Sequence, residues 1–310
     1  FESDELQALA YEQQTRDRLI APVRGEILDR NLNPIATNET VASVSVINSQ
    51  IIDKEEVAKA LSEKLEMDYD YVLEKVSKRV ALERIKTKVD KDLADEISRL
   101  GLRGVEVDED IKRIYPFSSM ASQVIGFVGK DNKGIIGLEA KYDEYLKGKS
   151  GKIMTETDAR GVEMKDGNES RVAPDNGYSL VLSIDSNLQQ YAEQTIEKAV
   201  EAKSAKRGAI IMMNPNNGEI LAMANKPDFD LNDPFTINSE EIAATWNNLS
   251  EKQKNDYLNQ MWRNFSINDT YEPGSTFKII TSTAGLQEKV VDLDSTFNCP
   301  GDRVVGGITI

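Results

Sequence analysis

The sequence predicts an α+β protein in which helices pack on antiparallel strands. Residues 179–184 and 208–213 have strand-like apolar patterns, and a helical pattern over residues 186–202 separates them. The turn at residues 214–218 ends in Asn-Gly, which accepts the positive φ angles of tight hairpins, and reverses the chain into a strand at 219–224. A second helical pattern begins near Ser275. Strand, helix, hairpin and helix in this order are typical of helices covering an antiparallel sheet.

The composition indicates a globular protein of about two domains. The chain has 310 residues, of which 39% are hydrophobic and 29% are charged, and its formal net charge is −15. Nucleic-acid binders need clustered Lys and Arg for phosphate contacts, so this charge excludes nucleic acid as an expected partner. The single cysteine, Cys299, permits no internal disulfide, and the redox compartment therefore cannot be inferred.

The amino-terminal half alternates between helical and strand patterns. The first twenty residues predict a polar helix or stalk that Pro22 ends, and a turn follows at residues 31–34. Apolar spacings of three and four predict helices, and alternation predicts strands. We expect strands at 41–46 and 105–107, and helices at 54–65, 68–79 and 91–100, the last of which stops at Gly101.

Glycines concentrate between Gly126 and Gly161 and predict turns around a short helix at residues 138–146. We place a domain boundary there, with a first domain at residues 1–150 and a second at 151–310. Ser186 is expected to cap the helix that follows. The sequence contains no apolar run of 18 residues and begins with Phe1, so we expect an amino-terminal targeting or anchoring segment to have been removed.

The most informative chemistry is a serine with a lysine three residues later, Ser275 and Lys278. The chain has no histidine, which excludes every Ser-His-Asp arrangement, and lysine remains the candidate base. Residues i and i+3 share a helix face, and Pro273-Gly274 predicts a turn that places Ser275 in the first helical turn, where backbone N–H groups suit an oxyanion. A lysine amine is almost fully protonated at pH 7, so the base role requires burial or a nearby cation.

An ordered set of motifs over nearly the whole chain resembles the class B penicillin-binding proteins, which are bacterial peptidoglycan D,D-transpeptidases. Each motif alone is weak, but their order is specific. The matching segments are residues 24–30, 113–116, glycines 126–137 with Glu139, 182–189, 214–223 and 272–278. The resemblance implies an elongated pedestal domain of the non-catalytic dimerisation type at residues 1–150. The amino-terminal part of a penicilloyl-serine transferase domain, β-lactamase-like, would follow at 151–310.

The resemblance also implies roles and partners. Ser275 would be acylated by the D-Ala-D-Ala end of a peptidoglycan stem peptide, and Lys278 would accept its proton; β-lactams would trap the same serine. The pedestal would contact a membrane glycosyltransferase of the shape, elongation, division or sporulation class. A single membrane anchor would precede the chain and hold it outside the bacterial cytoplasmic membrane.

Departures from the family pattern limit these expectations. The second motif (Ser-x-Asn) and third motif (Lys-Thr/Ser-Gly) are expected beyond Ile310, so this chain alone should acylate slowly or not at all. Gln123 stands where relatives often have histidine, and Asn217 where they often have threonine. Two alternatives stay open: a β-lactamase or β-lactam sensor, which shares the Ser-x-x-Lys chemistry, and a non-catalytic scaffold that binds the glycosyltransferase.

Several other conspicuous residues are expected to have structural roles. We interpret the arginines and aspartate of residues 24–30 as paired charges fixing a domain junction, and Glu139 and Asp185 as turn or helix-cap acids. Trp246 and Trp262 are expected to pack. No cofactor is expected, although Cys299 is a weak candidate ligand for a structural zinc.

Overall fold

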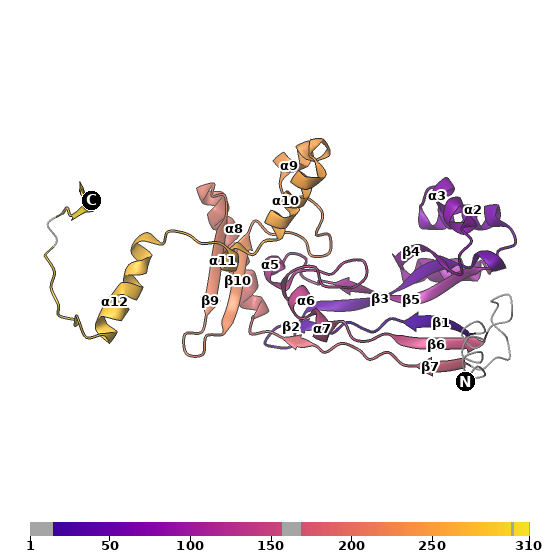
Figure 1. The fold of residues 1–310 in the computed structure, drawn as a ribbon, viewed down its shortest axis with the longest axis horizontal. Coiled ribbons are helices and arrows are strands. Elements are labelled where there is room, and N and C mark those ends of the chain that lie inside the picture. The colour runs from indigo at the N-terminus through magenta and orange to yellow at the C-terminus, as the bar shows by residue number, and fades with distance from the viewer. Residues whose placement is uncertain (1–14, 157–168, 299–300, 310) are drawn as a thin grey trace, which may run out of the picture. The chain divides into compact units, whose positions relative to one another are not determined.

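The computed structural model describes residues 15–156, 169–298 and 301–309, whose helices and strands are drawn in Figure 1. The chain divides into two compact units; the first ends at Ser266 and the second begins at Ile267. Both helices and antiparallel sheets form in the described residues, which confirms the predicted α+β class.

The long strand β3 (Pro34–Val46) organises the amino-terminal half of the first unit. It pairs antiparallel along its length with β5 (Val105–Ile114) on one side and with β4 (Glu83–Val89) on the other. Its first residues also pair with the short strand β2 (Ile27–Leu28). The sequence predicted a strand only from Val41. The polar residues before Val41 also belong to β3, because β3 pairs with other strands along both of its edges.

Three helices cover this sheet at the end drawn beside α2 and α3 in Figure 1: α2 (Lys54–Leu65), α3 (Tyr69–Ser77) and α4 (Lys91–Arg99). Their buried faces form one apolar core with β3 and β4. Asp53 and Asp68 cap α2 and α3 through backbone N–H groups of the first turn. These helices confirm the predicted segments to within two residues at either end, and Gly101 has the positive φ of 62° that ends α4.

One further strand prediction was too short, and the prediction of a helix or stalk at the amino terminus was wrong for residues 15–20. The strand predicted at 105–107 continues to Ile114, because ten successive residues of β5 pair with β3. Residues 15–20, predicted as part of a polar helix or stalk, form the strand β1 (Thr15–Ile20). β1 pairs with β6 (Gly151–Glu156), which pairs with β7 (Glu169–Val172). The conformation of β1 depends on strand partners more than a hundred residues away, and the local spacing of apolar residues contains no information about them.

The short helix α5 (Ser122–Ile125) precedes the glycine-rich segment, which contains two more, α6 (Gly137–Lys141) and α7 (Asp143–Leu146). The helix predicted at 138–146 is present as α6 and α7, but it is broken at Tyr142, which the sequence did not predict. Gly134 is required for space, since a Cβ there would lie 2.1 Å from the carbonyl oxygen of Glu139. This close backbone approach positions Glu139 for the buried contacts described below.

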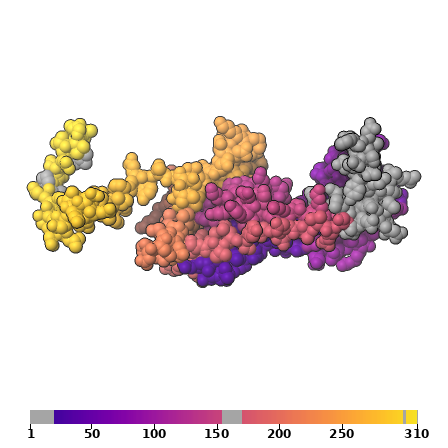
Figure 2. Space-filling view, turned by 60° about the horizontal axis from the view of Figure 1, so that its bottom comes forward, coloured from indigo at the N-terminus to yellow at the C-terminus, as the bar shows by residue number. Residues whose placement is uncertain are grey.

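The segment after β7 runs along the first strands of the chain. β8 (Leu180–Val181) is shorter than the strand predicted at 179–184 and pairs parallel with β2. In the space-filling view the indigo residues that follow β1 lie against this rose-coloured segment (Figure 2). The division into domains at residue 150 stays a prediction.

The helix and the hairpin predicted for the second half are confirmed. α8 (Ser186–Lys203) packs on the antiparallel pair β9 (Gly208–Met213) and β10 (Ile220–Lys226). Ala192 of α8 and Ala222 and Ala224 of β10 are fully buried and allow this close packing. Side chains on the opposite face of β9, such as Ile211 and Met213, are exposed.

A helical insert follows β10, with α9 (Glu240–Thr245), the 3-10 turn η2 (Trp246–Asn248) and α10 (Glu251–Trp262). Trp262 stacks edge-on against Phe127 with ring centroids 5.0 Å apart, and its indole N–H donates to the Pro234 carbonyl at 2.7 Å. Trp246 packs against the same core. The predicted packing roles of both tryptophans are confirmed.

The second unit carries the serine segment. After α11 (Phe265–Asn268), which spans the boundary between the units, come the 3-10 turn η3 (Gly274–Phe277) and α12 (Lys278–Gln287). A two-residue hairpin pairs β11 (Val304–Val305) with β12 (Ile308–Thr309). Among the described residues of both units, no helix is long and apolar enough to cross a membrane.

Candidate active site

Ser275 and Lys278 lie at the start of α12. Gly274 has a positive φ of 55° and brings the chain into the 3-10 turn that contains Ser275. The Thr276 hydroxyl donates to the Pro273 carbonyl at 2.6 Å, and the Lys278 N–H donates to the Ser275 carbonyl, so the turn closes on itself. Ser275 therefore precedes the first α-helical turn, in which the sequence had placed it, and Lys278 is the first residue of α12.

Both side chains are exposed within the second unit. Within the described residues, the Ser275 hydroxyl and the Lys278 ammonium form no hydrogen bond with each other. A serine nucleophile needs its base within hydrogen-bond reach. The two residues are close in sequence, but without this contact the lysine does not activate the serine. Their catalytic roles stay predictions.

The hairpin β9–β10 is held to α8 by a buried glutamine. Gln189 accepts from the Met223 N–H at 2.7 Å and donates to the Met223 carbonyl at 3.1 Å, so one side chain satisfies both backbone groups of this β10 residue. Asp185 caps α8 by accepting from the N–H groups of Asn187 and Leu188. The predicted cap role of Asp185 is confirmed, whereas Ser186, expected to be the cap, is the first residue of the helix.

Asp29 ties the turn after β2 to the start of α8. Its carboxylate accepts from the backbone and side chain of Asn33 and from the Ser186 hydroxyl, the last at 2.7 Å. The side chain is fully buried. Burial alone would raise its pKa, but the hydrogen bonds from Asn33 and Ser186 outweigh this effect and lower the pKa of Asp29 to about 2.

A second buried network joins two arginines through one glutamate. Glu139 receives the Arg24 Nε at 2.7 Å on one carboxylate oxygen and the Arg113 Nε at 2.7 Å on the other. Arg24 also pairs with Asp143 at 2.7 Å, and the Tyr115 hydroxyl donates to Glu139 at 3.3 Å. Two positive and two negative charges therefore balance inside the first unit, which offsets the loss of their hydration.

These contacts decide the predictions made for the charged residues. Arg24 is a paired charge as predicted, but its partners Glu139 and Asp143 lie in the same predicted domain. Asp29 contacts Ser186, beyond the predicted boundary at residue 150, through a hydrogen bond. The role of these residues at a domain junction stays a prediction. The cap role expected for Glu139 is wrong: Ile136 precedes α6 without a side-chain cap, and Glu139 is a buried ion-pair partner. The sequence shows no signal for this, because its partners are 115 and 26 residues away.

Glu193 and Lys226 were not singled out from the sequence. One Glu193 oxygen accepts from the Ala121 N–H and from the Gln189 amide, both at 2.7 Å, and burial raises the pKa of Glu193. Burial would lower the pKa of Lys226, but ion pairs with Asp228 and Glu197 raise it. The spacing of Gln189 and Glu193, four residues apart on one helix face, is the signal that indicates the first contact.

Metal binding has no support in the described part of the chain. Residues 15–156, 169–298 and 301–309 contain no group of three or more His, Cys, Asp or Glu side chains placed to hold an ion. Cys299 lies outside the described residues, so the zinc site stays a prediction.

Comparison with known families follows the order of the two halves. The model of the "Penicillin-binding Protein dimerisation domain" matches residues 19–182, and that of the "Penicillin binding protein transpeptidase domain" matches residues 208–309. The chain belongs to the class B penicillin-binding proteins. The family predicted from the motifs is confirmed, and so is the fold, a dimerisation-type domain followed by part of a transpeptidase domain.

The curated relatives of this penicillin-binding protein include a sporulation protein and peptidoglycan D,D-transpeptidases. It is 39% identical to stage V sporulation protein D of Bacillus subtilis (strain 168), over 94% of this chain and 42% of that protein. It is 32% identical to the peptidoglycan D,D-transpeptidase FtsI of Buchnera aphidicola subsp. Schizaphis graminum, over 94% of this chain and 49% of that protein. The chain therefore spans about half the length of the curated relatives it matches.

A solved structure supports the same assignment. A complex between penicillin-binding protein PBP2 and MreC from Helicobacter pylori matches with a TM-score of 0.70 and 26% sequence identity, covering 95% of this chain and 56% of that one. The fold is thus shared by a protein whose structure was determined with a partner bound.

Proposed function

We propose that the complete protein is a peptidoglycan D,D-transpeptidase in which Ser275 is the acylated nucleophile and Lys278 is its base. The main support is that the family models of the dimerisation domain and the transpeptidase domain match this chain one after the other. Ser275 and Lys278 lie inside the transpeptidase match. Relatives named D,D-transpeptidases extend over nearly the whole of this chain. The Ser-x-x-Lys motif is the first of three active-site motifs in this class of enzyme.

The proposed reaction has two acyl-transfer steps. Lys278 in its neutral form takes the Ser275 proton while the serine oxygen attacks the carbonyl between two terminal D-alanines. Collapse of the tetrahedral intermediate breaks the peptide bond, and Lys278 returns the proton to the departing D-alanine amine. An amine of a neighbouring stem peptide then attacks the acyl-serine ester, which forms the cross-link and restores the serine. Backbone N–H groups at the start of α12 are suited to stabilise the oxyanion.

We expect this 310-residue chain alone to acylate slowly. Ser275 and Lys278 are exposed in the second unit and are not hydrogen-bonded to each other. A serine nucleophile needs its base within hydrogen-bond reach, and this contact is missing here. In the complete protein further groups around the two residues would come from the second and third motifs that the family resemblance implies.

Partners and location extend the same proposal. The Helicobacter pylori relative was solved in complex with MreC, which supports a partner-binding role for this protein as well; we propose that the pedestal provides it. A membrane glycosyltransferase of the shape, elongation, division or sporulation class is the proposed enzymatic partner. The proposed location is the outer side of the bacterial cytoplasmic membrane, with a single-pass anchor before this chain.

A fluorescent penicillin tests the acylation directly. The complete ectodomain and the 310-residue chain are incubated separately with the probe, and any adduct is mapped by peptide mass spectrometry. We expect a stable adduct on Ser275 in the complete protein and a much slower one in the short chain. A folded complete protein with no adduct on Ser275 would refute the transpeptidase proposal. Rapid turnover of the adduct would instead indicate a β-lactamase.

A scaffold role is the second candidate. The buried charged residues of the first unit described above bind one another or neighbouring polar groups, and they form no arrangement of nucleophile and base. Substitution Ser275→Ala in the cell separates the two roles. Lost cross-linking with retained partner binding supports the enzyme, and full cellular function without the serine supports the scaffold.

A further inference from the structure

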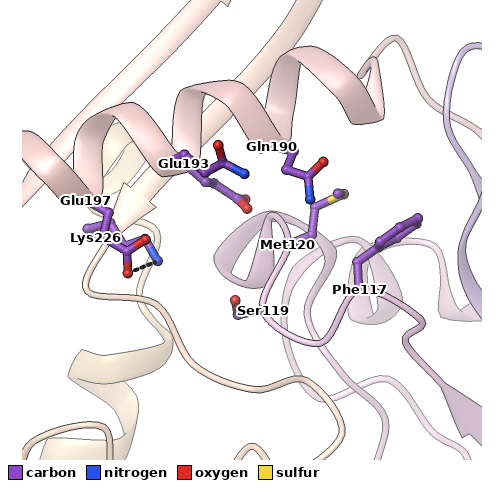
Figure 3. A pocket seen from close by; sticks show the side chains of 8 residues that line it. Phe117, Ser119, Met120, Gln190, Glu193, Glu197 and Lys226 are labelled. Carbon is purple, nitrogen blue, oxygen red and sulfur yellow. Dashed lines mark hydrogen bonds and ion pairs between the residues drawn. The ribbon is translucent and has the colours of Figure 1, made fainter.

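A cavity of about 370 Å³ lies between the loop at residues 117–120 and one face of α8. Figure 3 shows Gln190, Glu193 and Glu197 of the helix facing Phe117, Ser119 and Met120 of the loop, with Lys226 beside Glu197. Small-ligand pockets run from roughly 300 to 1,000 Å³, so this cavity has room for a small molecule. It belongs wholly to the first unit and includes neither Ser275 nor Lys278.

The cavity presents polar groups that have no partner in the part of the chain that the structure describes. Within the described residues, the side chains of Ser119, Gln190 and Gln194 make no hydrogen bond or ion pair. A hydroxyl and two amides can each donate and accept. A ligand that matches them must therefore carry several groups that both donate and accept, as sugar hydroxyls do.

The charges of the cavity select against anions. Glu193 and Glu197 line it with Lys226, so the net charge of the lining is negative. Lys226 is already engaged, because its ammonium lies 2.8 Å from Asp228 and 3.4 Å from Glu197. One Glu193 oxygen is likewise held by the Ala121 N–H and the Gln189 amide. Among the lining residues no positive charge is therefore free for a phosphate, and the uncharged donors and acceptors of Ser119, Gln190 and Gln194 favour a neutral ligand.

Two side chains supply an apolar surface next to these polar groups. Phe117, which is 44% exposed, and Met120, which is largely buried, both line the cavity. An exposed aromatic ring beside amides and a hydroxyl matches a pyranose ring, which has a face of C–H groups and an edge of hydroxyls. We propose that this cavity binds a short neutral saccharide, with Phe117 against the sugar face and Ser119, Gln190 and Gln194 on its hydroxyls.

Saturation-transfer NMR titration of the 310-residue chain with the trimer of N-acetylglucosamine tests this site. We expect saturable binding that Phe117→Ala weakens about five- to tenfold and that the double variant Gln190→Ala, Gln194→Ala weakens by at least about fivefold. Tyr191→Ala is the matched control, since Tyr191 is an exposed aromatic residue on α8 that does not line the cavity. It should leave the affinity within about twofold.

Two further measurements make the result decisive. The Ser275→Ala chain should bind the trimer as well as the unaltered chain does, which separates this site from the proposed acylation. The methyl ester of lysine, a small cation, should not compete. Absence of saturable binding, binding that the Phe117 and glutamine variants leave unchanged, or preferential binding of the lysine ester would each overturn the proposal.

Discussion

The charged side chains buried in the first unit and the polar side chains of the serine segment in the second unit differ in burial and in pairing. Arg24, Arg113 and Glu139 are each at most 5% exposed and are held by short ion pairs. Ser275 and Lys278 are exposed and have no side-chain partner in the described residues. Buried charges keep their places only if they are paired, whereas a residue free of structural contacts can be substituted without loss of the fold.

This contrast separates residues held in buried structural pairs from the residues that we propose carry the chemistry. The family motifs contain both kinds, and their sequence alone does not distinguish them. Variants in the two regions should therefore differ in what they change, and the following predictions run from the largest expected effect on stability to the smallest.

Replacing Glu139 should have the largest effect. Glu139→Gln leaves the Arg24 and Arg113 guanidinium groups buried with their shared carboxylate gone. Breaking a buried pair in this way typically costs about 3–5 kcal/mol. Chemical denaturation of the 310-residue chain measures the loss, and Glu144→Gln, an exposed neighbour on α7, should change stability by less than about 0.5 kcal/mol. Equal effects of the two variants would show that the network does not hold the first unit together.

Asp29→Asn should have the next largest effect, about 1.5–3 kcal/mol, because the charged acceptor of the Asn33 and Ser186 hydrogen bonds is lost. The effect should depend on pH. The pKa of Asp29 is lowered from 3.8 to about 2 in the folded protein, so its stabilisation is fully present above about pH 4 and is lost as the pH falls toward 2.

Denaturation of both proteins between about pH 6 and pH 2 checks this sign. The free energies of unfolding of the unaltered chain and Asp29→Asn should converge below about pH 4. A difference that stays constant down to pH 2 would contradict the hydrogen-bonded, ionised Asp29.

Gln189→Ala should have a smaller effect, about 1–3 kcal/mol, because the Met223 N–H and carbonyl lose their partner at the edge of β10. Hydrogen exchange of the Met223 amide should become faster. Lys198→Ala, an exposed substitution on the same helix, should leave that exchange unchanged. Unaltered protection in Gln189→Ala would mean that the hairpin does not depend on this glutamine.

Local signals predicted the elements whose causes are local. The amphipathic spacing of α2, α4 and α8 and the Asn-Gly turn between β9 and β10 needed only neighbouring residues, and the structure has all of them. Asp185 was predicted as a cap for the same reason, because a cap bonds to the helix it precedes.

Distant partners explain what the sequence did not show. β1 is a strand because β6 lies beside it, and β3 and β5 extend each other by pairing over ten residues. The role of Glu139 depends on Arg24, 115 residues earlier. The positions of Ser275 and Lys278 followed from the motif, but the 3-10 turn that contains Ser275 depends on Gly274 and Pro273 and was expected to be α-helical.

The most direct test combines acylation of the complete protein with the stability of the 310-residue chain, each with the substitution Ser275→Ala. We predict that the complete protein loses the penicillin adduct and that the 310-residue chain unfolds within about 0.5 kcal/mol of the unaltered chain, since a serine that is exposed there without a side-chain partner contributes little to stability. An adduct that persists in Ser275→Ala, or a loss of stability comparable to that of Glu139→Gln, would contradict the assignment of chemistry to this segment and of structure to the buried charges.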